Sequence, residues 1–319
     1  MTSRPDPMHP RPHDADAPPV SVLVSMYNHE RYVETCLDSL RDEGYPGLEV
    51  IVLDDGSADG GYRVAERWRG RNPDAFARFT LLRQKNQGIA RVLNRLISLA
   101  SYEYLALVSA DDYLLPGGIA ARVEALRRNP QWLWVFADNV VVDENGELVH
   151  DSSIEGLFGG NRAALANDRT RAFELIARWS VAGSVPLVRR EAFDRTRGVG
   201  SYDETLFVDD RDMYLRLLAR GAVGYVDRPV AAYRVHGQSA AHAHSKRVQT
   251  SVTESELKNV KLFSGFARTL IQVKAIRARD TDRMEEARGV RRTVYRGRVS
   301  IARRLCDLFL TVNDMRARF

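Results

Sequence analysis

The chain has 319 residues, 44% of them hydrophobic and 28% charged, which suits one large α/β domain with an appendage or two modest domains. No apolar run approaches the roughly 20 residues that cross a bilayer. The N-terminus carries Asp6, Asp14 and Asp16 where a secretory signal would be apolar, so we expect no such signal. Cys36 and Cys306 lie far apart in apolar patterns, which predicts buried thiols in a cytoplasmic protein and excludes a disulfide framework or a zinc site.

The net charge of +5 is concentrated at the C-terminus. From Lys274 to Phe319, 13 Lys and Arg stand against 6 Asp and Glu, whereas the remaining 273 residues carry a net charge of −2. A nucleic-acid-binding domain would carry its basic residues across the recognition surface. We therefore expect no nucleic-acid partner.

The first half of the chain predicts alternating strands and helices. Residues 1–19 hold six of the twelve prolines and almost no large apolar residues, which predicts a disordered tail. The elements that follow are strand Val20–Val24, a helix with Tyr32, Val33, Cys36, Leu37 and Leu40 on one face, strand Glu49–Leu53, helix Asp59–Trp68, strand Phe79–Leu82, a helix from Ile89, strand Tyr104–Val108 and a helix after Pro116. This alternation favours a parallel sheet with right-handed crossovers, whose ligands bind beyond the carboxyl ends of the strands.

The pattern changes from Trp132 onwards, where a mixed second half is expected to extend the same sheet. Its predicted elements are a strand over Trp132–Val142 with a hairpin at Glu144-Asn145-Gly146, helix Ala172–Trp179, strand Val185–Val188, helix Asp212–Leu218 and strand Val230–Val235. Beyond about Ser245 the sequence becomes helical and basic.

Two predicted strands end in adjacent aspartates. The first ends in Asp54-Asp55-Gly56-Ser57 and the second in Ser109-Ala110-Asp111-Asp112. Adjacent like charges are unfavourable unless a cation or hydrogen-bond donors offset them. Mg²⁺ and Mn²⁺ prefer carboxylate oxygens and usually share them with substrate phosphates, so a metal-bridged diphosphate would suit these ends. Alternatively, Asp-Gly-Ser is a turn and helix cap, and Asp111-Asp112 caps the segment that runs to Pro116.

Seven segments, in this order, give the chain from Val20 to about His236 its resemblance to glycosyltransferase family 2: SVLVSMYN, EVIVLDDGS, NQGIARVLN, LALVSADD, the strand around Gly183 to Leu187, DDRDMYLRL and YRVHGQS. The resemblance implies a GT-A fold, an α/β architecture in which helices flank a Rossmann-like, mostly parallel central sheet, here with a C-terminal helical extension. It also implies a catalytic domain over 20–244, with a nucleotide-binding half (20–130) and an acceptor-binding half (131–244). A basic helical arm over 245–319 follows.

The resemblance assigns site roles by position. Donor contacts fall on Ser25, Tyr27, Asp55, Asn86, Gly88 and Asp111. Among these, Asp55 would accept a hydrogen bond from the base, most commonly uracil, and Asp111 would approach the ribose or sugar. Asp112 and His236 would contact the divalent metal, Mn²⁺ or Mg²⁺. Alternatively, Gly88 only starts its helix and His236 is a surface residue.

The catalytic base implied by the resemblance is Asp210, at the start of a predicted helix. It would take the proton of an acceptor hydroxyl in a direct displacement that inverts the anomeric centre. Capping of that helix is the alternative role for these aspartates, and we favour it for Asp209 and Asp212.

The predicted function is therefore metal-dependent transfer of a sugar, most commonly from a UDP-sugar, to a carbohydrate or lipid-linked acceptor in surface polysaccharide or glycoconjugate synthesis. A sugar nucleotidyltransferase is the rival enzyme, but it usually has a Gly-rich, basic loop where this chain reads Ser25-Met26-Tyr27-Asn28-His29. A non-catalytic scaffold that binds polyanions or membranes is the rival from another class. The basic arm would pack on the catalytic domain or on a second subunit, or would attach to an anionic membrane at its cytoplasmic face.

Overall fold

The computed structural model describes residues 17–183, 185–207, 209–237 and 245–317. Residues 1–16, the greater part of the predicted tail, lie outside the described residues. Where the description begins, the Tyr45 hydroxyl donates to the carbonyl of Pro18 at 2.8 Å. This contact joins the start of the described chain to the turn after the first helix.

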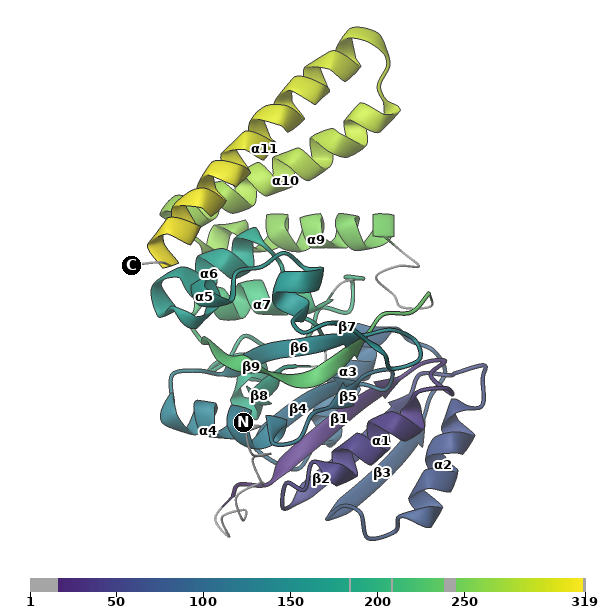
Figure 1. Ribbon diagram of the computed structural model, residues 1–319. Helices are drawn as coiled ribbons and strands as arrows, with labels where there is room; N and C mark the ends of the chain where they lie inside the picture. The colour runs from purple at the N-terminus through teal and green to yellow at the C-terminus, as the bar shows by residue number, and fades with distance from the viewer. Residues whose placement is uncertain (1–16, 184, 208, 238–244, 318–319) are drawn as a thin grey trace, which may run out of the picture.

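The first half of the chain folds as the predicted alternation of strands and helices (Figure 1). Its elements are β1 (Val20–Met26), α1 (Val33–Asp42), β2 (Leu48–Asp54), α2 (Gly61–Arg71), β3 (Arg78–Arg83), α3 (Ile89–Leu99), β4 (Tyr104–Ser109), the short β5 (Tyr113–Leu114) and α4 (Gly118–Arg128). The apolar face predicted for α1 is buried through Val33, Cys36, Leu37 and Leu40. Burial of one apolar helix stripe against the sheet is what makes these helices stable.

The second half is mixed, also as predicted. Its elements are β6 (Trp134–Val142), β7 (Leu148–His150), η1 (Ser153–Leu157), α5 (Arg162–Ala166), α6 (Asp168–Ala177), β8 (Leu187–Arg189), η2 (Arg190–Phe193), α7 (Asp209–Ala219) and β9 (Val223–Arg234). The C-terminal elements are α9 (Ser245–Asn259), η3 (Val260–Leu262), α10 (Gly265–Glu286) and α11 (Gly289–Ala317).

The strands of the described chain join in one nine-stranded sheet in the order β3-β2-β1-β4-β8-β6-β9-β5, with β7 beside β6. The first four strands of this order are parallel, whereas β8 runs antiparallel to β4 and to β6. From β1 the chain steps outward to β2 and β3 and then returns to β4 on the other side of β1. Right-handed crossovers therefore place α1 and α2 on one face and α3 on the other, with a topological switch point between β1 and β4.

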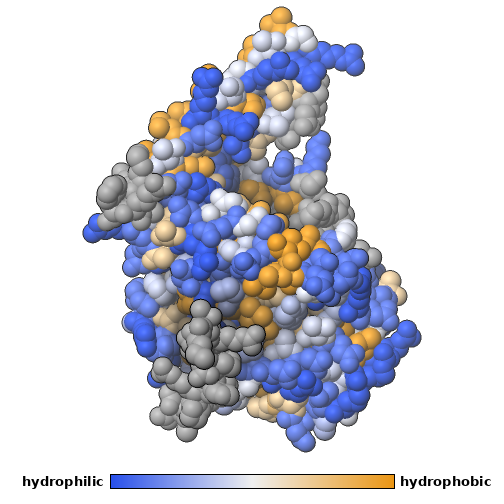
Figure 2. All heavy atoms as spheres, viewed as in Figure 1, coloured by the Kyte–Doolittle hydropathy of each residue, from blue (hydrophilic) through white to orange (hydrophobic). Residues whose placement is uncertain are grey.

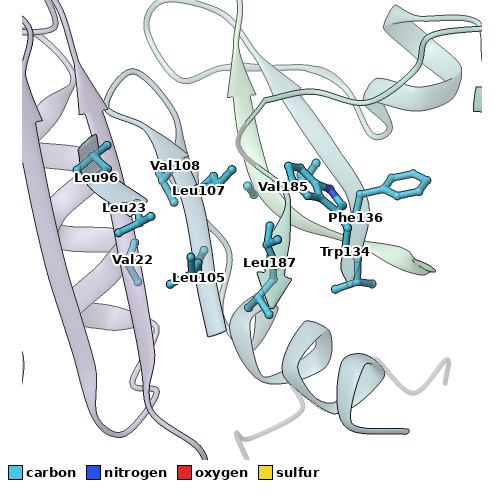
Figure 3. Close-up of a cluster of buried hydrophobic side chains, with 14 of the residues drawn as sticks. Val22, Leu23, Leu96, Leu105, Leu107, Val108, Trp134, Phe136, Val185 and Leu187 are labelled. Atoms are coloured by element: carbon cyan, nitrogen blue, oxygen red, sulfur yellow. The ribbon is translucent and has the colours of Figure 1, made fainter. Parts of the chain in front are cut away.

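The hydrophobic core continues from the parallel half of the sheet into the mixed half (Figure 3). Val22 and Leu23 of β1 are fully buried beside Leu105 of β4, and Trp134 and Phe136 of β6 continue the same buried layer. One continuous core fixes the carboxyl ends of β1 and β4 relative to the mixed strands, and it is these ends that carry the site residues.

The helices α10 and α11 form a hairpin that projects from the rest of the molecule (Figure 1). At its base, Leu270 and Ile271 of α10 and Cys306 of α11 are buried in the core cluster. Within the described residues, no helix has both the length and the apolar composition needed to span a membrane.

Candidate active site

The candidate site lies at the switch point, where β1 and β4 end side by side. The N–H of Ala110 donates to the carbonyl of Ser25 at 2.9 Å, which joins the two strand ends. Ser25 is buried, whereas the side chain of Tyr27 in the next loop is 47% exposed. Of these two predicted donor contacts, Tyr27 is the one open to a ligand from solvent.

The aspartates after β2 face different partners. The buried Asp54 accepts from the N–H and hydroxyl of Ser57 and pairs with Arg83 Nε at 3.0 Å. Asp55 accepts from the backbone N–H groups of Gln87 and Gly88, each at 2.9 Å. Asp55 therefore anchors the loop between β3 and α3.

The Asp55 carboxylate has one further donor, Gln84 Nε2 at 2.8 Å. A carboxylate accepts about four hydrogen bonds, and this structure already uses most of that capacity. An additional bond to a nucleobase would displace the Gln84 amide first, since a side chain moves more easily than the anchored backbone.

Asn86 and Gly88 border a groove of about 920 Å³ between the start of α3, residues 204–207 and α9. Asn86 is exposed, and Gly88 caps α3 with a φ of +88°. The groove also contains Arg91, Lys246 and Arg247. Gly88 therefore does start its helix, and it also lies on an open groove.

The aspartates after β4 are held by a residue from the last strand. The backbone N–H of Arg234 donates to Asp112 Oδ1 at 2.8 Å, and Arg234 Nε donates to the carbonyl of Asp111 at 2.9 Å. The Arg234 guanidinium lies 4.7 Å from the ring centroid of Tyr32 and 5.7 Å from that of Tyr113. Cation–π contacts and the planar guanidinium thus fix the backbone that carries both carboxylates.

Two histidines point at one carboxylate oxygen. His236 Nε2 lies 3.0 Å from Asp111 Oδ2, and His29 Nε2 lies 3.6 Å from the same atom. His236 is thus buried against Asp111, and the metal that we expected it to share with Asp112 stays a prediction. Burial alone would raise the pKa of Asp111, but the hydrogen bond to His236 and the charge of His29 outweigh it and hold that pKa at about 2.

Asp210 lies in the first turn of α7 and accepts from the N–H of Arg211 at 2.7 Å. Burial raises the pKa of its carboxyl to about 6, against the weaker effect of the Arg211 N–H. The neighbouring Asp212 is fully buried and bonds Arg216, Lys258 and Asn259. Asp212 therefore has a structural role, while the carboxyl of Asp210 has a raised pKa.

The Tyr233 phenol lies within electrostatic range of these groups. Burial raises its pKa, and the charges of Asp112, Asp111 and Asp210 raise it further. Asp210 and the aspartates after β4 therefore act on one hydroxyl, although about a hundred residues separate them in sequence.

The sequence did not point to His29, Arg234 or Tyr233 as site residues. His29 follows β1 directly, so its position at the carboxyl edge of the sheet was the signal that could have found it. Arg234 and Tyr233 lie inside the strand β9, where only the pairing of β9 with β5 brings them beside Asp112.

Comparison with known proteins places this site in a family. The family model described as "Glycosyl transferase family 2" matches residues 21–197, from β1 through β8. The chain belongs to glycosyltransferase family 2. The match covers the ends of β1, β2 and β4, and Asp210 and His236 lie beyond it.

Family 2 relatives differ in length from this chain. EpsH of Bacillus subtilis (strain 168), whose name assigns it to the glycosyltransferases, is 39% identical over 241 residues, which are 73% of this chain and 65% of the relative. The chondroitin synthase of Escherichia coli is 22% identical over 253 residues, which are 76% of this chain and 34% of that enzyme. The chain thus spans less than two thirds of both relatives.

Solved structures show the same GT-A fold. TarS 1-349 from S. aureus, in complex with UDP-GlcNAc, superposes with a TM-score of 0.61 at 16% identity, over 82% of this chain and 73% of that one. The mannosyltransferase PcManGT from Pyrobaculum calidifontis, in complex with GDP-Man and Mn²⁺, superposes with a TM-score of 0.58 at 18% identity, over 99% of this chain and 91% of that one. The predicted fold class, with its C-terminal helices, is confirmed.

Proposed function

We propose that this family 2 protein is an inverting glycosyltransferase, with Asp210 as the base that activates an acceptor hydroxyl. The proposal is supported by the charges of Asp111, Asp112 and Asp210, which all act on the Tyr233 hydroxyl, with the pKa of Asp210 raised to about 6 and that of Asp111 lowered to about 2. Two acidic groups with separated pKa values suit one proton acceptor and one permanent anion.

The proposed donor is a nucleotide-diphosphate sugar that binds across the switch point. Its base would lie near Ser25, Tyr27 and Asp55, and its sugar would extend past Asp111 towards Asn86 and Gly88. We favour UDP over other nucleotides. The complexes of the two structural neighbours, with UDP-GlcNAc and GDP-Man, support the donor class and leave the base to be measured.

The acidic residues after β4 are suited to a divalent metal. Asp111 Oδ1 is buried and has no hydrogen-bond partner among the described residues, and an unpaired buried carboxylate oxygen favours a cation. In that part of the chain, no three His, Cys, Asp or Glu side chains are grouped so that they could hold a metal by themselves. Mn²⁺ or Mg²⁺ held by Asp112 and His236 would therefore take oxygens of the donor phosphates as further ligands, as these cations commonly do.

The proposed reaction is a single displacement. The acceptor oxygen bonds to the anomeric carbon as the bond from that carbon to the diphosphate breaks, and Asp210 takes the acceptor proton. A divalent cation at Asp112 and His236 would offset negative charge on the departing diphosphate. Arg234 keeps the two aspartates oriented through its bonds to the backbone and side chain after β4.

The acceptor is proposed to be a carbohydrate or lipid-linked glycan of a surface polysaccharide. The synthases of chondroitin and hyaluronan among the relatives support a role in polymer synthesis.

A panel of nucleotide sugars tests the proposal. The full chain is incubated with UDP-, GDP- and other nucleotide-activated sugars, with Mn²⁺, Mg²⁺ or a chelator, and release of the nucleoside diphosphate is measured. We expect slow hydrolysis of one donor class, strongest for a UDP-sugar, that the chelator abolishes. Release of pyrophosphate from a nucleoside triphosphate and a sugar phosphate would indicate a nucleotidyltransferase and would overturn the proposal.

A further inference from the structure

The helix α11 carries an apolar stripe on a face that none of the other described residues covers. Its members are Val290, Val294, Ile301, Leu305 and Leu308, which are 81%, 53%, 62%, 40% and 61% exposed. At 100° per residue these positions, with Gly297 among them, fall within about 80° of the helix circumference. Five large exposed apolar side chains on one helix face form a docking surface, because isolated surface apolar residues show no such alignment.

The buried face of the same helix points elsewhere. Ala302 and Cys306 are buried, and Arg298 Nε pairs with the buried Asp280 of α10 at 2.9 Å. These contacts fix α11 against α10 and leave the apolar stripe outside the pairing. Figure 2 shows hydrophobic and hydrophilic residues side by side on the projecting hairpin.

Arginines border the apolar stripe. By helical position, Arg291 and Arg298 lie on one side of it and Arg304 on the other, and all three are exposed. Over its whole length α11 has seven arginines and two aspartates. A second copy of this helix against the stripe would bring these arginines against one another, and like charges beside a helix–helix seam are destabilising.

We propose that this stripe docks on an anionic lipid bilayer, with α11 lying in the plane of the interface. The apolar side chains enter the headgroup and acyl boundary, while Arg291 and Arg304 at the borders of the stripe bind anionic headgroups. From Val290 to Leu308 the stripe is about 27 Å long. The proposed contact is peripheral, and no described helix can span a membrane. The projection of the hairpin leaves the length of α11 free to lie on a surface while its base packs on the rest of the molecule (Figure 1).

Vesicle co-sedimentation of the full chain tests this docking surface. The vesicles are phosphatidylcholine alone or phosphatidylcholine with a minority of phosphatidylglycerol, each at low and at high salt. We expect binding to the anionic vesicles and little to the neutral ones, with a marked loss at high salt. Equal binding to both vesicle types, or none to either, would overturn the proposal.

Paired variants distinguish membrane binding through the stripe from nonspecific adsorption of exposed apolar side chains. Ile301→Ser with Leu308→Ser, and separately Arg291→Gln with Arg304→Gln, should each weaken binding to anionic vesicles by about ten-fold. The matched control is Leu148→Ser with Leu257→Ser, which removes apolar side chains of similar exposure, 60% and 53%, on β7 and α9. Control binding should be unchanged, and an equal loss in the control would contradict the proposal.

Two further measurements test whether the variants are folded and whether a second copy of the chain covers the stripe. All variants should keep the wild-type thermal midpoint and nucleoside diphosphate affinity, because the substituted side chains are exposed and lie outside the cleft. In sedimentation velocity without lipid, the wild type should not self-associate through this face. A wild-type dimer that the Ile301→Ser, Leu308→Ser variant dissociates would show that a second copy covers the stripe, and the membrane proposal would fail. None of these results depends on the donor or on Asp210.

Discussion

At the scale of single residues, the pKa values of two buried carboxylates shift in opposite directions because their partners differ. Asp210 accepts from the backbone N–H of Arg211, and burial outweighs this bond and raises its pKa to about 6. Asp111 faces His236 and His29, which lower its pKa to about 2 despite burial. A base works best when its pKa lies near the operating pH, whereas a residue that binds cations must remain charged.

The rate should therefore depend on pH through Asp210. Proton acceptance requires the ionised carboxylate, which prevails above a pKa of about 6 and is lost as pH falls below it. We expect the turnover number to fall about ten-fold for each pH unit below 6. The measurement is a profile of kcat at saturating donor and acceptor. A rate that stays constant from pH 7 to pH 5 would contradict the role of Asp210.

Arg234 should control donor affinity through the position of Asp111 and Asp112. Arg234→Lys keeps the positive charge but loses the planar guanidinium. That group bonds the carbonyl of Asp111 and contacts the rings of Tyr32 and Tyr113. We expect about ten-fold weaker binding of the nucleoside diphosphate with Mn²⁺, by calorimetry. The control is Arg228→Lys, a half-buried arginine of the same strand that donates to the carbonyl of Pro116, which should bind as the wild type does. Equal affinity of both variants would remove Arg234 from this role.

The sequence readily predicted which acidic residues lie at the edge of the sheet. It did not predict which side chains these acidic residues contact. Asp55, Asp111 and Asp112 follow predicted strands, so their place at the carboxyl edge of the sheet follows from topology. The pairing of His236 with Asp111 joins residues that lie 125 positions apart. It depends on the lateral register of β9 against β5. No local pattern encodes that register, so the sequence left it open.

At the scale of elements, Gly56 sets how closely the loop after β2 approaches the loop after β3. Its φ is +77°, and an added Cβ would lie 2.9 Å from the N atom of Asn86 and 3.0 Å from the carbonyl O of Gln84. An alanine here is strained and also pushes on backbone that cannot move freely.

Gly56→Ala should destabilise the protein and displace the loop that borders the groove beside Asn86 and Gly88. We expect a loss of about 1–3 kcal/mol in unfolding free energy, with weaker donor binding. Denaturant unfolding and calorimetry measure the two effects. Gly70→Ala is the matched control, because an added Cβ there meets nothing within 4 Å and alanine favours the helix α2. A Gly56→Ala protein as stable as this control would contradict the close approach.

Strands and helices of the first half were predictable because each is a short, strongly patterned segment. The strand β1 extends the predicted Val20–Val24 by two residues, and α2 begins at Gly61, two residues after the predicted start. The two-residue strand β5 was not predicted, since Tyr113 and Leu114 form a strand only because β9 lies beside them. Tertiary pairing, and not local propensity, creates such an element.

At the scale of the whole molecule, the C-terminal helices support the start of α7. Arg211, next to Asp210, is fully buried and bonds Glu256 of α9 at 2.6 Å, and Lys274 of α10 pairs with the same carboxylate at 3.0 Å. The arm thus packs on the catalytic domain at its base. This was one of the arrangements that the sequence left open.

Glu256→Gln should therefore affect both stability and turnover. The substitution leaves Arg211 and Lys274 without the carboxylate that they share. We expect the free energy of unfolding to fall by about 3–5 kcal/mol. The helix that positions Asp210 should also be held less firmly. Thermal unfolding and kcat measure these effects. Glu124→Gln, which breaks an exposed pair with Arg128, should change stability by no more than about 1 kcal/mol. Similar small effects in both variants would show that the buried pair does not support the site.

The central claim is that Asp210 accepts the acceptor proton in a cleft that binds the donor without it. Asp210→Asn keeps the size and shape of the side chain and cannot act as a base. The direct measurement combines kcat of this variant with its affinity for the donor, beside Asp74→Asn as an exposed control. We predict that kcat falls by about 10²–10⁴-fold while donor affinity is unchanged and the control behaves as the wild type. Near-normal turnover in Asp210→Asn would contradict the account.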